Sequence, residues 1–185
     1  MIKRKNIDNI KRENWLANAA MSAVIVMIFL SLGNASSMLQ YAMIASASIT
    51  GFYFWWGACY IAAKLEKEKS ITEYLFDFLG VVIVLALFLI PYSNPNGKLW
   101  LLAYAALFCF GVAKNYWLFK KSTESYAKSF SLRKTKIDSL ALLLFGLFFM
   151  VSLIADIEIY LITAIFFIEL LHIIYVDLTK FYEKI

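Results

Sequence analysis

The sequence has few of the residue types that build metal, haem and thiol sites. It holds one histidine, His172, and two cysteines, Cys59 and Cys109, which lie in different apolar stretches. A single histidine excludes a haem held by two histidines, and the cysteines lack the C-x-x-C spacing of zinc sites and redox dithiols. We therefore expect no metal and no cofactor, and we interpret both cysteines as small packing residues.

Proline and glycine are also scarce, at two and seven residues of 185. Transporters with discontinuous helices need breaks at the binding site, so this scarcity favours continuous helices. Pro91 and Pro95 are close together, and we expect both in one turn. The sequence contains no glycine-rich phosphate loop, no nucleophile elbow and no H-E-x-x-H, which makes an enzyme the least favoured class of function.

Apolar residues, in contrast, make up 62% of the chain. They gather in six stretches, at 15–32, 39–63, 74–91, 99–119, 137–155 and 159–178. At about 1.5 Å per helical residue, each stretch is long enough to cross a hydrocarbon layer of about 30 Å. The sequence therefore predicts an all-α polytopic membrane protein with six transmembrane helices.

Lysine and arginine concentrate in alternate connections between these stretches. The first and fifth connections have none and the third has only Lys98, whereas the N-terminal arm 1–14, the second connection, the loop 120–136 and the tail 179–185 are basic. The positive-inside rule places these basic segments, and both chain ends, in the cytoplasm. The other connections are short, so the bundle 15–178 is predicted to be three antiparallel hairpins, in a bacterial inner membrane.

The expected partners follow from the same pattern. A net charge of +5 beside apolar spans favours the bilayer and its anionic headgroups, and no nucleic-acid partner is expected. On stretch 39–63, Ala42, Ser46 and Thr50 recur every four residues, which predicts a central helix with close neighbours. A second copy of the chain or a larger membrane complex is a candidate protein partner.

A small set of polar residues falls inside the predicted spans. Glu169 is the costliest, because it lies about 16 Å from either end of the last helix, where insertion of a charge costs about 2.5 to 3.5 kcal/mol. His172 shares its face, one turn closer to the cytoplasm. Similar depths in the inner half are predicted for the other candidates, and almost no polar groups for the outer half. The candidate ion or proton site comprises Glu169, His172, Asp77, Lys114, Asn18 and Asn115.

Two interpretations of this layer remain open at this point. In the structural one, Lys114 pairs with Asp77 or Glu169, His172 is neutral, and the cluster fixes helix register. In the functional one, Glu169 gains and loses a proton or small cation beside His172, and the protein is a channel or transporter. The alternative function is a non-catalytic accessory, assembly or immunity-type membrane subunit that acts through protein contacts.

Overall fold

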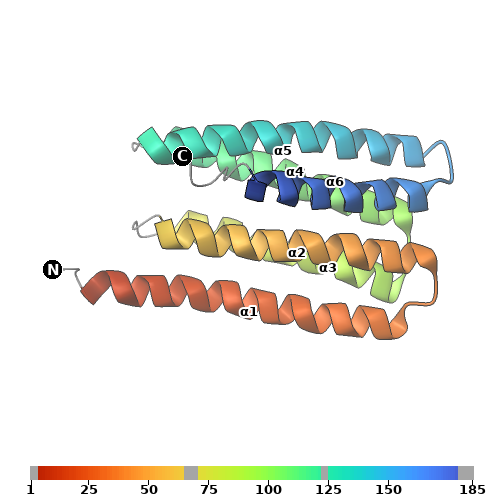
Figure 1. The fold of residues 1–185 in the computed structure, drawn as a ribbon, viewed down its shortest axis with the longest axis horizontal. Helices are drawn as coiled ribbons and strands as arrows, with labels where there is room; N and C mark the ends of the chain where they lie inside the picture. The colour runs from red at the N-terminus through yellow and green to blue at the C-terminus, as the bar shows by residue number, and fades with distance from the viewer. Residues whose placement is uncertain (1–3, 65–70, 122–124, 179–185) are drawn as a thin grey trace.

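The chain is all-helical wherever its backbone is described. The computed structural model describes the backbone of residues 4–64, 71–121 and 125–178, and the side chains of 18–55, 72–121 and 128–175. Its helices lie side by side as an elongated bundle (Figure 1). They are α1 (Arg4–Asn34), α2 (Met38–Lys64), α3 (Ile71–Ser93), α4 (Gly97–Lys121), α5 (Ser125–Ser152) and α6 (Glu158–Leu178).

Among the residues whose side chains are described, four helical segments are long and apolar enough to cross a membrane. The segments are Thr72–Ser93, Gly97–Lys121, Lys128–Ser152 and Glu158–Tyr175, and the part of α1 whose side chains are described, Asn18–Asn34, is apolar too. Large apolar side chains on their outer faces are exposed, such as Phe29, Leu143 and Leu171. An exposed apolar surface of this kind suits lipid rather than water. The fold is therefore all-helical with several helices able to span a membrane, while the number of spans and their orientation stay predictions.

The connections define two ends of the bundle. We call the end with the short connections α1–α2, α3–α4 and α5–α6 the turn end. The opposite end, where α1 begins and α6 ends, is the terminal end (Figure 1). Helix α5 packs mainly against α4 and only lightly against α6.

The basic segment 120–136, expected as a loop, is largely helical in the structure. Helix α4 continues to Lys121 and helix α5 already begins at Ser125. Phe130 and Ser131 are buried, so the segment has an inward face that extends α5. Phe130 among its lysines is thus part of the buried face of α5, whereas Leu132 is exposed. Averaging hydropathy over a basic segment hides such a face.

Pro91 also differs from the expectation that both prolines lie in the turn, because it is part of α3. A proline has no N–H, so the carbonyl of Leu87, four residues earlier, loses its helical partner. The indole N–H of Trp100 on α4 donates to this carbonyl at 3.0 Å. The helix therefore tolerates Pro91 because a neighbouring helix replaces the missing donor.

The core lies where α2, α3, α4 and α6 meet. The largest fully buried side chains include Trp100 and Tyr104, whose rings stack with centroids 4.9 Å apart. Ser46 and Ala47 of α2 are fully buried, and the Ser46 hydroxyl donates to the Ile162 carbonyl of α6 at 3.3 Å. Helix α2 contacts α1, α3, α4 and α6, so its predicted central position is confirmed.

Candidate functional site

Glu169 lies on the buried face of α6, near the middle of the helix. Ile162 and Ile165, seven and four residues earlier, are fully buried on the same face. Their packing directs the Glu169 side chain between α2 and α4. Its Oε1 accepts a hydrogen bond from the Thr50 hydroxyl of α2 at 2.6 Å and another from the Tyr104 hydroxyl of α4. One carboxylate thus joins three helices.

The second oxygen of this carboxylate, Oε2, is buried and has no hydrogen-bond partner within the described residues. A buried polar atom without a partner carries a desolvation cost of about 1 to 3 kcal/mol, and more if it is charged. Thr50 also contacts the Ser46 carbonyl at 2.9 Å and the Tyr104 hydroxyl at 3.3 Å. Because one hydroxyl carries one proton, these contacts are alternatives rather than simultaneous donations. The site has unused acceptor capacity at Oε2.

His172 forms a second group, one helical turn toward the terminal end. Its Nε2 lies 3.2 Å from the hydroxyl of Tyr53 on α2, and the two rings meet edge to face. The ammonium of Lys134 on α5 lies 5.3 Å from the centre of the Tyr53 ring. Lys134 pairs with Asp138 at 3.5 Å, and Asp138 accepts from the Asn115 amide at 2.7 Å. Polar groups of α2, α4, α5 and α6 therefore continue from Glu169 toward the terminal end.

The remaining predicted residues have partners other than Glu169 in the structure. Lys114 of α4 pairs with Asp77 of α3. Asn18 of α1 accepts a hydrogen bond from the Trp55 indole at 3.3 Å. The six candidates therefore take part in local groups of contacts on different pairs of helices.

Sequence reasoning missed several of the partners, namely Thr50, Tyr53, Tyr104, Lys134 and Asp138. Thr50 was interpreted mainly as part of a small-residue packing stripe, whose Ser and Thr can hydrogen-bond across helices and which could also line a narrow polar path. A depth comparison would have indicated it, because Thr50 and Glu169 each lie about 17 Å along their helices from the turn end. Nothing in the sequence distinguishes Tyr104 from the other aromatic residues of α4. Lys134 belonged to a segment expected to be a loop.

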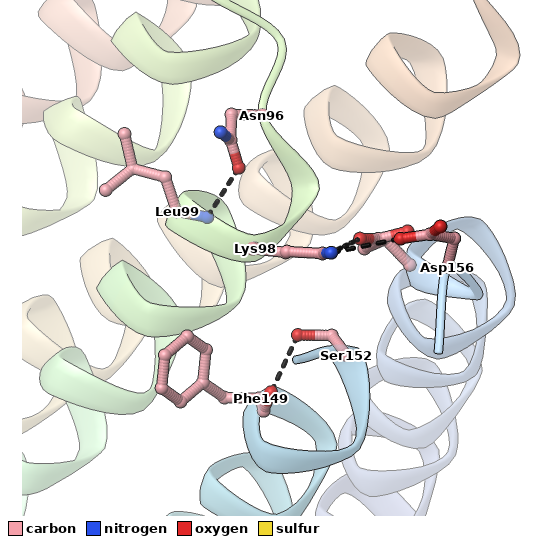
Figure 2. A network of polar contacts seen from close by, with 7 residues as sticks. Asn96, Lys98, Leu99, Phe149, Ser152 and Asp156 are labelled. Carbon is pink, nitrogen blue, oxygen red and sulfur yellow. Dashed lines mark hydrogen bonds and ion pairs between the residues drawn. The ribbon is translucent and has the colours of Figure 1, made fainter. Parts of the chain in front are cut away.

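The turn end carries polar contacts that the sequence did not predict. Lys98 at the start of α4 pairs with Asp156 at 3.0 Å and with Glu158 at 3.5 Å (Figure 2). Gln40, only 5% exposed, donates to the Pro91 carbonyl of α3 at 2.9 Å. Its own side-chain oxygen accepts from the backbone N–H of Ser36 at 2.8 Å. These contacts join α4 to α6 and α2 to α3 at the turn end.

Within the residues whose side chains are described, no group of three or more His, Cys, Asp or Glu residues is arranged to hold a metal ion. No family model, curated protein or solved structure matches this chain. The function is therefore inferred from the chemistry of its own residues. Among these, the Glu169 carboxylate and the polar groups that follow it toward the terminal end are the most distinctive.

Proposed function

We propose that this protein binds or passes a proton or a small cation through a site centred on Glu169. It would do so as a six-span protein with three antiparallel hairpins and both ends in the cytoplasm of a bacterial inner membrane. The turn end then faces outward and the terminal end inward. His172 is on the cytoplasmic side of Glu169 in this orientation.

The observation that carries the proposal is the uneven environment of the Glu169 carboxylate. Oε1 is held by two hydroxyls from two helices, whereas Oε2 is buried without a described partner. A carboxylate used only to join helices would gain stability from partners on both oxygens. An oxygen left available is typical of a group that receives a proton or ion during its work.

The distribution of charge bears on both interpretations: the Asp77–Lys114 pair is a contact that the structural one predicts, whereas the surroundings of Glu169 support the functional one. The Asp77–Lys114 contact compensates one acid with one base. Lys114 is therefore paired with Asp77 rather than with Glu169, and among the described residues Glu169 makes no ion pair. A buried acid without a base beside it is costly in a membrane, so its presence indicates a functional role.

The test is ion flux into proteoliposomes that contain the purified protein. We expect proton or monovalent-cation uptake over about pH 5.5 to 8, the range in which histidine titrates, and its loss in Glu169→Gln. Glu158→Gln is the matched control, because it makes the same change on the same helix at the turn end. Equal flux in wild type and Glu169→Gln, or no flux from well-folded wild type, would contradict the proposal.

A further inference from the structure

We propose that the species exchanged at Glu169 is a proton, that it travels between Glu169 and the terminal end through His172 and Tyr53, and that Lys134 keeps metal cations out of this route. This inference rests on the proposed function of Glu169. It adds the identity of the ion, the side of access and the residues that select it.

The groups around Glu169 suit a proton better than a metal cation. In the contacts with Oε1 the hydroxyls of Thr50 and Tyr104 are the donors, so in this arrangement their protons rather than their lone pairs face the carboxylate. A metal cation that sheds its water needs a shell of oxygen acceptors in place of its hydration. A proton needs only one acceptor, and Oε2 is that acceptor.

Tyr53 and His172 are suited to relay this proton. The tyrosine hydroxyl both donates and accepts hydrogen bonds, and the neutral imidazole ring donates from one nitrogen and accepts at the other. They lie in mutual contact at 3.2 Å. His172 follows Glu169 by three residues on one helix, so the two side chains are neighbours, with Cβ atoms about 5 to 6 Å apart. The pair lies on the terminal side of the carboxylate.

Lys134 supplies a positive charge beside this relay. Its ammonium lies over the Tyr53 ring and is held there by Asp138, which Asn115 in turn fixes. At the His172 ring the charge of Lys134 outweighs the opposite charge of its partner Asp138. A metal cation that moves past this ring therefore meets a net repulsion, which is stronger in a region of lower dielectric. A proton moves instead by rearrangement of hydrogen bonds along Tyr53 and His172.

The groups that bear on the titration of the site come from each neighbouring helix. Thr50 and Tyr104 contact Glu169 itself. The charges of Lys134 and Asp138 act on the His172 ring. Tyr53 of α2 completes the set. The Asp77–Lys114 pair belongs to the separate α3–α4 contact.

The experiment measures proton and sodium uptake separately in proteoliposomes, with a trapped pH-sensitive dye for one and radioactive sodium for the other. Wild type is compared with Glu169→Gln, Tyr53→Phe, His172→Gln and Lys134→Gln. Tyr160→Phe is the matched control for Tyr53→Phe, because Tyr160 is exposed near the turn end of α6. Helix content and elution volume in detergent establish that each variant is folded.

We expect wild type to take up protons and no sodium. A well-placed proton donor and acceptor accelerates proton transfer by about 10²-fold or more, so Tyr53→Phe and His172→Gln should slow proton uptake by at least about tenfold. Tyr160→Phe should match wild type. Lys134→Gln should admit sodium. If Tyr53→Phe does not fold, His172→Gln by itself tests the relay.

The possible failures are distinguishable. Sodium uptake by wild type that depends on Glu169 would overturn the proton assignment and leave the proposed function standing. Proton uptake that Tyr53→Phe and His172→Gln leave unchanged would overturn the relay. Proton selectivity that survives in Lys134→Gln would overturn the role of Lys134. Uptake that is indifferent to Glu169→Gln would refute the proposed function and this inference with it.

Discussion

At the scale of single residues, Gly111 and Asp138 fit closely together in the terminal half of the bundle. A Cβ atom at Gly111 would lie 2.8 Å from the Asp138 Oδ2, the oxygen that accepts from Asn115. Asn115 also donates to the Gly111 carbonyl at 2.9 Å. The absence of a side chain at Gly111 therefore allows α4 and α5 to approach closely enough for the Asn115–Asp138 hydrogen bond.

Gly111→Ala should destabilise the protein by about 1 to 3 kcal/mol, because the added methyl group must displace Asp138 from its partners. Gly146→Ala on α5 is the control, because nothing lies within 4 Å of its Cβ position. There we expect a gain of about 0.5 to 1 kcal/mol from the better helix propensity of alanine. The free energy of unfolding in mixed detergent micelles measures both effects. Equal effects of the two substitutions would show that the Gly111 contact is unimportant.

At the scale of helices, a side chain of one helix supplies a hydrogen-bond donor that a neighbouring helix lacks. Pro91 leaves the Leu87 carbonyl of α3 without its helical donor, and the Trp100 indole of α4 supplies one. Gln40 of α2 donates to the Pro91 carbonyl itself, so this turn of α3 is held from two sides. The turn end of the bundle is therefore joined through main-chain groups as well as side chains.

Trp100→Phe should lower the free energy of unfolding by about 2 to 3 kcal/mol, through lost packing and an unpaired Leu87 carbonyl. In a Pro91→Ala background the restored N–H at residue 91 can serve that carbonyl, so the same substitution should cost about 1 kcal/mol less. A double-mutant cycle measures this coupling energy. Additive effects would mean that Trp100 stabilises α3 by packing alone.

At the scale of the whole molecule, the surface is apolar along the helices and polar at the two ends. Exposed Leu, Phe and Ile side chains cover the sides of the bundle, while Lys98, Asp156 and Glu158 pair at the turn end. Lys120 and Lys121 lie over the rings of Tyr116 and Trp117 at the terminal end. Aromatic rings beside lysines are typical of helix ends at a membrane interface.

The predicted orientation has a direct test in whole cells. In a variant without Cys59 and Cys109, we expect Asn94→Cys at the turn end to react with a membrane-impermeant thiol reagent. Lys120→Cys should react only after the cells are opened, because the basic connections are predicted to be cytoplasmic. Both side chains are exposed, so access to the reagent depends on sidedness. The reverse labelling pattern would invert the bundle and place His172 on the outer side of Glu169.

The sequence by itself determined the class of the molecule. Whether a segment is apolar enough to leave water depends on its own residues, so the helices and their lipid-facing character follow from local composition. The depth of Glu169 and His172 also follows from the helical rise along one element. The same argument failed at Pro91 and in segment 120–136. Pro91 is part of a helix because Trp100 supplies a donor, and segment 120–136 is largely helical because Phe130 packs inward. Both contacts lie outside the local sequence.

Only the tertiary structure decided which polar groups meet. Several hydroxyls and charges have similar depths, and their pairing depends on how each helix is rotated about its axis and which neighbour it packs against. The rotation of each helix pairs Lys114 with Asp77 and Asn115 with Asp138. It also brings Thr50 and Tyr104 into contact with Glu169. Depth is a property of one helix, whereas a contact is a property of two, and this is why the sequence located Glu169 without identifying its partners.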